Sequence, residues 1–246
     1  MFVTDRNPLA RSLQLLWQGL PERAKGPKSR LTLGQIVTAG IELADADGID
    51  ALSMRNLAQK LGVGTMSLYR YVPAKAELLD LMLDAVVGPS QARRAAAERG
   101  WREFLVTTAR EARKLYLTHP WALQANWSRP VLGPNSVADL NLFFAGVKNL
   151  SLSDQERMNL ATAIDSYVTG AVRQELLWLN ASSESGMSDD EFWTYQLPTL
   201  NRVMSSGRFP EMADLSDDTF DSTWEENFEF GLELILNGLE TRLRRP

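Results

Sequence analysis

The chain has 246 residues, of which 44% are hydrophobic and 23% charged, the ordinary balance of a soluble globular protein with room for one large or two modest domains. It contains no cysteine and a single histidine, His119, so disulfides, thiolate metal sites and paired-histidine metal sites are excluded and no cofactor is expected. No apolar stretch approaches the roughly 20 residues of a membrane span, and residues 1–12 lack a signal-peptide core; we expect a cytoplasmic protein without a membrane partner.

Positive charge gathers at the N-terminus, although the net charge is −5. Residues 1–30 carry six basic side chains against two acidic ones, a net charge of +4. Residues 31–75 balance four basic against four acidic side chains, so the remainder carries −9. A basic end on an acidic body favours an anionic partner for that end. The alternative is a basic tail that only keeps the chain in solution.

The first 30 residues are predicted to form a basic arm and linker. Leu13, Leu15, Leu16 and Trp17 have the spacing of one short helix. Residues 21–28 combine proline, glycine and charge without apolar periodicity, which indicates a flexible connection.

Four helices are predicted in the next segment. They cover residues 32–47, 53–61, 65–71 and 75–87. Thr32 with Gln35 forms a capping-box pattern at the start of the first, and Ser53 caps the second. Gly40 lies on the apolar face of the first, where it allows a neighbouring helix to approach. Pro73 ends the third helix, because proline disfavours helical geometry in the residue before it.

The remaining two thirds are also predicted to be helical, with turns rich in Gly, Pro and Ser between the segments. Pro198 is expected to kink or split the helix that contains it. The predicted helices cover residues 90–98, 101–118, 121–126, 135–149, 153–181, 189–205 and 219–243. Since there is neither a period-2 strand pattern nor an internal repeat, the expected fold class is all-α.

Three short helices with a glycine-bearing turn between the second and third are typical of a helix-turn-helix. The third helix of such a motif enters the major groove, so one side must be exposed and the other held rigidly. The holding side is formed by Leu57, Leu61, Val63 and Leu68. The other side presents Thr65, Met66, Tyr69 and Arg70. Such side chains can pack on a thymine methyl, bond a guanine edge or bond a phosphate.

Several motifs occur together between residues 31 and 88: Gly48 at the end of the first helix, Ser53-Met54-Arg55, Leu57-Ala58, Leu61-Gly62-Val63, Leu68-Tyr69 and Pro73-x-Lys75-x-x-Leu78-Leu79. This stretch resembles the N-terminal domain of the tetracycline-repressor (TetR) family. The resemblance implies a helix-turn-helix domain at 31–80 that binds double-stranded operator DNA, and a helical effector-binding and dimerisation domain at 81–246. Arg70 and Tyr71 depart from the repressor that gives the family its name, so its operator sequence does not carry over.

The resemblance assigns roles to matching positions. Thr65 and Met66 fall where the family reads bases. The phosphate-gripping positions are Ser67, Tyr69 and Lys75, and Arg55 falls where the second helix meets the edge of the DNA. Alternatives stay open: Met66 as packing only, Arg70 as a solvated side chain, and Tyr71 as core.

Lys28 and Arg30 lie just ahead of the first helix of the motif. We expect them to touch phosphates or the adjacent minor groove, as homeodomain arms do. A disordered, solvated tail is the equal alternative.

The long helices predicted at 153–181 and 219–243 are candidates for a homodimer interface. The second has two apolar stripes, Trp224, Phe228, Gly231 and Ile235, and beside it Leu232, Leu236, Leu239 and Leu243. A helix with so broad an apolar surface needs two partners. In the TetR family this pair of helices builds the dimer, and two-fold symmetry then matches a near-palindromic operator. An ordinary monomeric core is the alternative.

A small-molecule effector is expected in the C-terminal domain, because Thr169-Gly170-Ala171-Val172 resembles the corresponding helix of the tetracycline-repressor subgroup and the domain is rich in aromatic side chains. The candidate pocket residues are Trp121, Gln124, Trp127, Phe143, Asp165, Ser166, Gln174 and Trp178. Most of the aromatics are expected in the core, and Gln124 is expected to be solvated. For Asp165, a buried structural acceptor is the equal alternative. His119 is expected to cap a helix end, and the magnesium ion of the tetracycline repressor is not carried over.

Effector binding is expected to shift the helix that begins at Lys75 and to separate the two recognition helices. An enzyme is the first rival, but no nucleophile–histidine arrangement, phosphate loop or metal spacing is present. The second rival is a helical adaptor or effector-binding protein without specific DNA binding.

Overall fold

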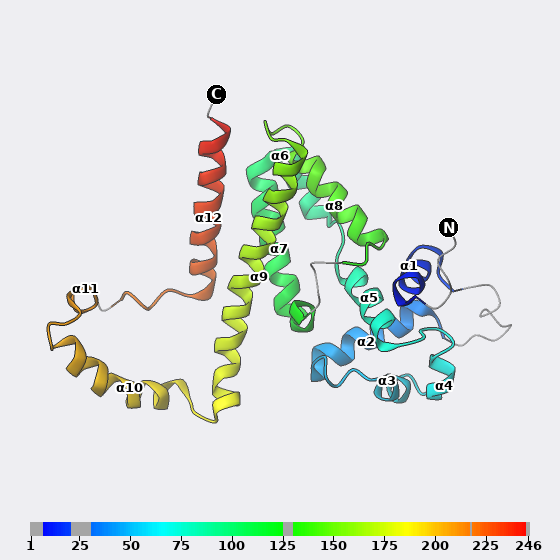
Figure 1. Cartoon of the computed structure of the whole chain (residues 1–246), viewed down its shortest axis with the longest axis horizontal. Helices are drawn as coiled ribbons and strands as arrows, with labels where there is room; N and C mark the ends of the chain where they lie inside the picture. The colour runs from blue at the N-terminus through cyan, green and yellow to red at the C-terminus, as the bar shows by residue number, and fades with distance from the viewer. Residues whose placement is uncertain (1–6, 21–30, 125–129, 217, 245–246) are drawn as a thin grey trace. The chain divides into compact units, whose positions relative to one another are not determined.

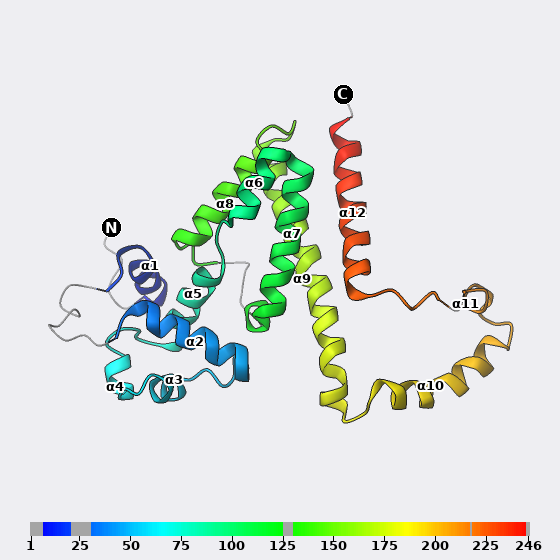
Figure 2. The same ribbon diagram turned by 180° about the vertical axis from the view of Figure 1, so that it is seen from behind.

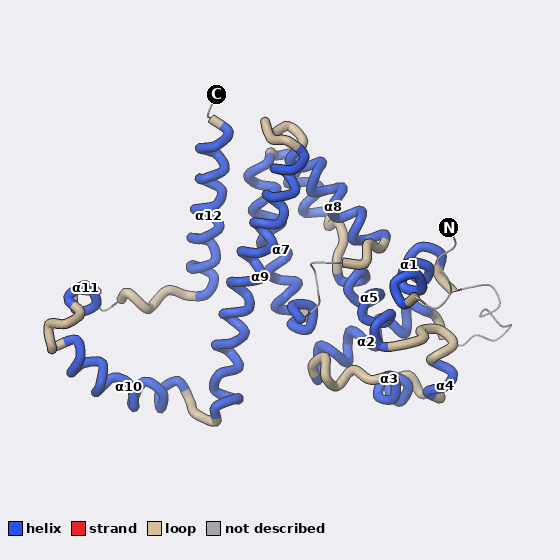
Figure 3. The backbone as a smooth tube through the Cα atoms, viewed as in Figure 1, coloured by secondary structure: helices blue, strands red, loops and turns tan. Residues whose placement is uncertain are grey.

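The chain is built from helices. The computed structural model describes residues 7–20, 31–124, 130–216 and 218–244, and in these ranges it contains no strand (Figure 3), which confirms the all-α class. The chain divides into two compact units, residues 1–165 and 166–246, with the division inside one long helix. None of the described helices combines the length and apolarity needed to cross a bilayer.

The N-terminal half of the first unit places five helices around a small core (Figures 1 and 2). They are α1 (Pro8–Gln18), α2 (Leu33–Asp47), α3 (Met54–Lys60), α4 (Thr65–Leu68) and α5 (Lys75–Val86). The predicted capping box is present at α2, where Thr32 and Gln35 bond each other's backbone. Ser53 caps α3 as predicted, and Asn7 caps α1 with Pro8 as its first residue. The short N-terminal helix thus begins earlier than the leucine pattern indicated.

Close packing of α2 on α5 holds this core together. A β-carbon at Gly40 would lie 2.9 Å from the Met82 sulfur, so the absence of a side chain lets the two helices approach. Leu57 of α3 and Leu68 of α4 are fully buried beside them, while Leu61 and Val63 are half-buried. The predicted holding side of the recognition helix is therefore confirmed at Leu57 and Leu68 and only partly buried at Leu61 and Val63. The expected domain boundary at 80/81 falls within α5, which runs through it without interruption.

The recognition helix α4 is shorter than predicted: it ends at Leu68 rather than Tyr71. The Arg70 N–H bonds the Ser67 carbonyl and the Tyr71 N–H bonds the Leu68 carbonyl, so each bond spans only three residues. This tighter winding is common where a helix ends. Tyr71 is half-buried there, ahead of the proline that prevents continuation.

The rest of the first unit is a helical body. It contains α6 (Gln91–Arg99), α7 (Trp101–Thr118), the 3₁₀ helix η2 (Pro120–Gln124), α8 (Pro134–Val147) and the start of α9 (Asp154–Ser185). Phe104 and Phe143 pack in its core with ring centroids 6.0 Å apart. Arg93 is buried there and pairs with Asp139 of α8. The helix predicted at 121–126 is a 3₁₀ turn over its described residues, and residues 125 and 126 lie outside them.

The second unit contains the rest of α9, α10 (Asp189–Met204), α11 (Pro210–Ala213) and α12 (Trp224–Leu243). Pro198 does not split α10, because the surrounding residues are exposed and water can bond the carbonyl that proline leaves free. Helix α12 begins at residue 224, not 219, because a capping box between Thr223 and Glu226 sets its start. The short α11 lies between the helices predicted at 189–205 and 219–243, where no helix was predicted. Tyr167 of α9 stacks on Phe228 of α12 with centroids 5.5 Å apart.

Candidate nucleic-acid interface

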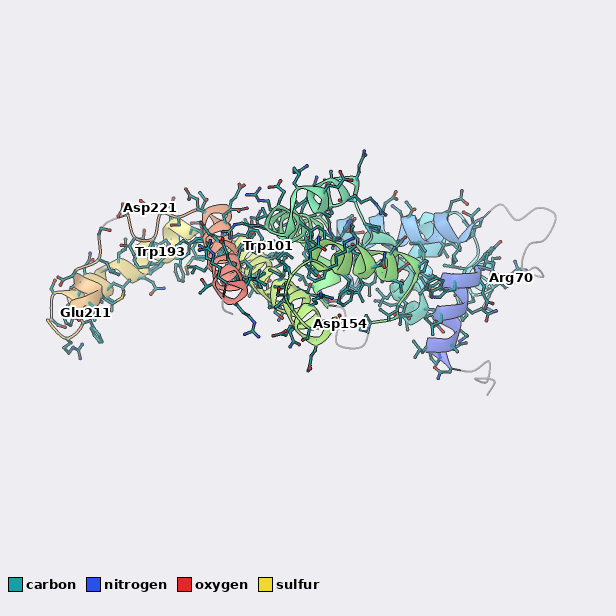
Figure 4. The ribbon with its side chains drawn as sticks, turned by 90° about the horizontal axis from the view of Figure 1, so that it is seen from above. Arg70, Trp101, Asp154, Trp193, Glu211 and Asp221 are labelled. Carbon is teal, nitrogen blue, oxygen red and sulfur yellow. The ribbon has the colours of Figure 1, made fainter. Side chains whose placement is uncertain are left out.

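Helix α4 presents one side to solvent and buries the other. Met66 is 78% exposed and Tyr69 41% exposed, whereas Leu68 between them is fully buried. Arg70, which follows the helix, is exposed at the edge of this unit (Figure 4). Gly62, in the turn before the helix, has a φ of 65°, a left-handed conformation that favours glycine. The turn and the buried leucine together fix which side chains point outward.

The exposed side of α4 combines four kinds of contact group. Thr65 and Ser67 are half-buried and supply hydroxyls, Met66 supplies a thioether and Tyr69 a phenol. The Arg70 guanidinium donates to the Ser67 Oγ at 3.4 Å, which holds both side chains on the same surface. Hydroxyl, apolar and guanidinium groups on α4 and on the two residues after it have the chemistry to contact base edges and phosphates.

Two predicted contact residues outside α4 have different surroundings. Arg55 is exposed in the first turn of α3. The Lys75 ammonium donates to the Ile49 carbonyl at 2.9 Å, and so stabilises the loop between α2 and α3. This bond joins residues 26 positions apart, so the sequence does not predict it. The phosphate contact expected of Lys75 stays a prediction. Lys28 and Arg30 lie outside the described residues.

The far end of α5 is bonded to the body through Asp84. This buried carboxylate accepts hydrogen bonds from the Ser136 N–H at 2.9 Å, the Ser136 hydroxyl at 2.7 Å and the Asn135 N–H at 3.3 Å. Two of these three donors are backbone N–H groups in the first turn of α8, where a negative charge is favoured by the helix dipole. The helix that begins beside the recognition helix therefore ends in a bonded contact with the body.

A second connection joins α2 to the end of α7. One oxygen of Asp45 accepts from the Trp121 indole at 2.7 Å and lies 2.8 Å from the His119 Nδ1. The backbone N–H of His119 bonds the Leu115 carbonyl, which confirms the expected helix-end position of this residue. Trp121, a predicted pocket residue, is buried, and its indole N–H bonds α2 through Asp45.

The other pocket candidates of the first unit lie in different settings. Phe143 is buried in the aromatic core, Gln124 is exposed, and Trp127 lies outside the described residues. The Asp165 carboxylate accepts from the Tyr116 hydroxyl at 3.2 Å. Solvent reaches Asp165, yet the surrounding protein displaces enough water to raise the pKa of its carboxyl, and the bond from Tyr116 offsets part of that rise.

Tyr116 is the polar partner that residue spacing did not reveal, since it lies 49 positions from Asp165. Burial, reinforced by the Asp165 charge, raises the pKa of its phenol, which therefore stays a hydrogen-bond donor at neutral pH. The remaining candidates, Ser166, Gln174 and Trp178, are exposed in the second unit. Across the described ranges, no group of three or more His, Cys, Asp or Glu side chains is arranged to hold a metal ion.

Two family profiles match the chain. Residues 36–82 match the profile of "Bacterial regulatory proteins, tetR family", and residues 95–243 match "Tetracyclin repressor-like, C-terminal domain". Together they span the region that holds the exposed α4 and the helices of the body.

Similar proteins and structures agree with these profiles. The "HTH-type transcriptional repressor DrrR1" of Streptomyces coeruleorubidus is 47% identical over 232 residues, 94% of this chain and 86% of the relative. An "HTH-type transcriptional regulator" of Saccharopolyspora erythraea is 32% identical over 221 residues, 89% of each chain. The crystal structure of ActR from Streptomyces coelicolor in complex with actinorhodin is similar with a TM-score of 0.65 at 28% identity, over 86% of this chain and 96% of that one.

Proposed function

The chain belongs to the TetR family of transcriptional regulators, and we propose that it is a homodimeric repressor that leaves a near-palindromic operator when a small, largely apolar effector binds its helical body. The observation that carries the proposal is α4, a short helix whose exposed side offers Met66, Tyr69 and neighbouring hydroxyls over a fully buried leucine. TetR-family regulators are in general non-enzymatic. The proposed location is the cytoplasm, where a regulator of this bacterial family would reach its operator.

The proposed operator contacts come from α3, α4 and the start of α5. They are Arg55, Thr65, Met66, Ser67, Tyr69, Arg70 and Lys75, with Lys28 and Arg30 as contacts of the arm. Base readout falls to the exposed side chains of α4, and phosphate contacts to the hydroxyl, phenol and basic groups around them. The 47% identical relative that is named a repressor supports repression as the mode of regulation.

The proposed effector site lies in the body. ActR has been solved in complex with actinorhodin and with (S)-DNPA, which supports a small-molecule effector here. In the body the candidate contacts are Trp121, Gln124, Trp127, Phe143 and Asp165, to which we add Tyr116 as the donor beside Asp165. Ser166, Gln174 and Trp178 belong to the second unit and stay separate candidates. Trp121 also holds α2 through Asp45, so a ligand that moves Trp121 would disturb the DNA-binding helices directly.

The proposed dimer uses exposed apolar side chains of α9 and α12. Phe230 and Leu234, one helical turn apart on α12, are 66% and 59% exposed, and Leu177 of α9 is also exposed. Three of the four leucines in the second predicted stripe are buried, so the face available to another subunit is centred on Phe230 and Leu234 instead. Two-fold symmetry then presents two copies of α4 to two half-sites about one DNA turn, roughly 34–36 Å, apart.

The test is selection of duplexes from a randomised library by the full chain, followed by gel shifts at several salt concentrations. We expect a near-palindromic sequence to be enriched. Met66→Ala should then weaken binding to that sequence while leaving the salt dependence unchanged, because an apolar base contact displaces no counterion. Arg55→Ala should instead lower the salt slope by about 1. Failure to enrich any sequence would contradict the proposal and favour an effector-binding protein without specific DNA binding.

A further inference from the structure

Helix α5 carries three acidic side chains on one side, Glu77, Asp80 and Asp84. The Glu77 side chain is 1% exposed, and Asp84 is buried as well. A buried carboxylate is costly unless a counter-ion or hydrogen-bond donors replace its water. Asp84 has its hydrogen-bond donors at the start of α8. The partners of Glu77 and Asp80 therefore show which other helix α5 depends on.

Those partners come from α1, the helix that precedes the DNA-binding motif. The Arg11 Nε lies 3.1 Å from the Glu77 Oε1, and the Ser12 hydroxyl donates to the Asp80 Oδ2 at 2.5 Å. Ser12 is fully buried, an unusual position for a serine unless it is bonded. Burial raises the pKa of Asp80 and the Glu77 charge adds to this, while the Ser12 bond opposes it. Polar side chains thus lie on the inner side of α1, beside the buried Leu15.

The other end of α1 reaches the segment that leads into α8. The Trp17 indole donates to the Leu132 carbonyl at 3.0 Å. Leu132 immediately precedes Gly133, the residue that caps α8, and Asp84 bonds the first turn of that helix. Helix α1 therefore contacts both α5 and the segment that leads into α8. Figures 1 and 2 show α1 beside α5.

We propose that α1 is a brace that holds α5 in place against α8, and that Arg11 and Ser12 are positioning residues for operator binding which do not touch DNA. The inference rests on the proposed function and extends it to a segment that precedes the matched family profiles. The chemical basis of the proposal is the buried Glu77 carboxylate. Its burial is tolerated because the Arg11 guanidinium, whose side chain is one third exposed, supplies the counter-ion.

Loss of Arg11 has a defined physical consequence. The Glu77 carboxylate would stay buried without its counter-ion, a state that is relieved when α1 leaves α5 and water enters. Helix α5 would then be free to sample more positions, and operator binding would have to remove that freedom. Binding should weaken although no contact with DNA is lost.

The test compares the full chain with Arg11→Ala, with the exposed α1 control Gln14→Ala, and with the double variant Arg11→Met/Glu77→Leu. Hydrogen exchange is measured over residues 8–18 and 75–86, and affinity is measured for the duplex selected by the unaltered chain. We expect Arg11→Ala to exchange faster in both segments and to bind about tenfold more weakly, with an unchanged salt slope. Gln14→Ala should match the unaltered chain, and the double variant should recover protection and affinity, because an apolar pair can replace a buried ion pair.

Three outcomes would overturn the brace: unaltered exchange in Arg11→Ala, faster exchange with full affinity, or a salt slope lowered by about 1, which would make Arg11 a phosphate contact. If the unaltered chain selects no duplex, the proposed function fails separately. The brace is then judged by exchange alone, where faster exchange over 75–86 in Arg11→Ala supports it and unchanged exchange rejects it.

Discussion

At the scale of single residues, the contact between Gly133 and Asp84 shows how closely α5 and α8 are fitted. Gly133 has an ordinary extended backbone, so its role does not come from conformational freedom. A β-carbon there would lie well inside van der Waals contact of the Asp84 carboxylate. Since that carboxylate bonds the first turn of α8, any added atom must displace a buried, bonded charge.

Gly133→Ala should therefore lower the free energy of unfolding by about 1–3 kcal/mol through overpacking. Urea denaturation measures this loss. The matched control is Gly34→Ala in α2, where a β-carbon meets nothing closer than 4.0 Å and a helix former replaces glycine. Equal midpoints for the two variants would show that Asp84 moves aside without cost.

At the scale of elements, the helices of the first unit are connected by polar bonds between distant residues as well as by apolar packing. Asp45 joins α2 to η2, and Asp84 joins α5 to α8. Each bond crosses from the DNA-binding helices to the body, so the motif is not attached through the chain alone. A change in the body can therefore reach α4 by two routes, one through α2 and one through α5.

The route through α2 can be weakened at Trp121. Trp121→Phe removes the indole donor to Asp45 and keeps most of the buried ring, so we expect a loss of about 1–3 kcal/mol in the free energy of unfolding, since the acceptor is charged. Thermal and urea unfolding measure the effect. Trp193→Phe on α10 is the control, because Trp193 is partly exposed and its replacement should change little. A Trp121 variant as stable as this control would show that the bond to Asp45 adds nothing.

At the scale of the whole molecule, exposed apolar side chains on α9 and α12 support the proposed homodimer. Large apolar residues exposed together on a helix mark an interaction surface more often than a solvated face. Phe230 and Leu234 form such a pair on α12. In a DNA-binding protein with one recognition helix per chain, a two-fold dimer also supplies the second reading helix.

Phe230→Asp should shift the protein from dimer to monomer in sedimentation velocity and weaken operator binding in parallel, because a charge on a desolvated apolar face opposes association. Phe220→Asp is the control: Phe220 is 78% exposed and lies outside the helices of the unit. A Phe230→Asp variant that remains a dimer would place the interface on another face.

The sequence by itself determined the class of fold, the start of most helices and the recognition helix. Capping pairs such as Thr32 with Gln35 act over three residues, and apolar periodicity acts within one helix, so both can be read locally. The buried side of α4 followed from the same periodicity. Two local errors had local causes: α4 winds more tightly before Pro73, and a second capping box moves the start of α12 to Trp224.

Only the tertiary structure decided how the parts are connected. The bond between Trp17 and Leu132 spans 115 positions, that between Trp121 and Asp45 spans 76, and that between Ser12 and Asp80 spans 68. An acidic residue on an amphipathic helix reads as solvated until the element that covers it is known, which is why Glu77 and Asp84 carried no signal. The recognition helix is a local property of the chain, whereas its attachment to the body depends on polar atoms that only folding brings together.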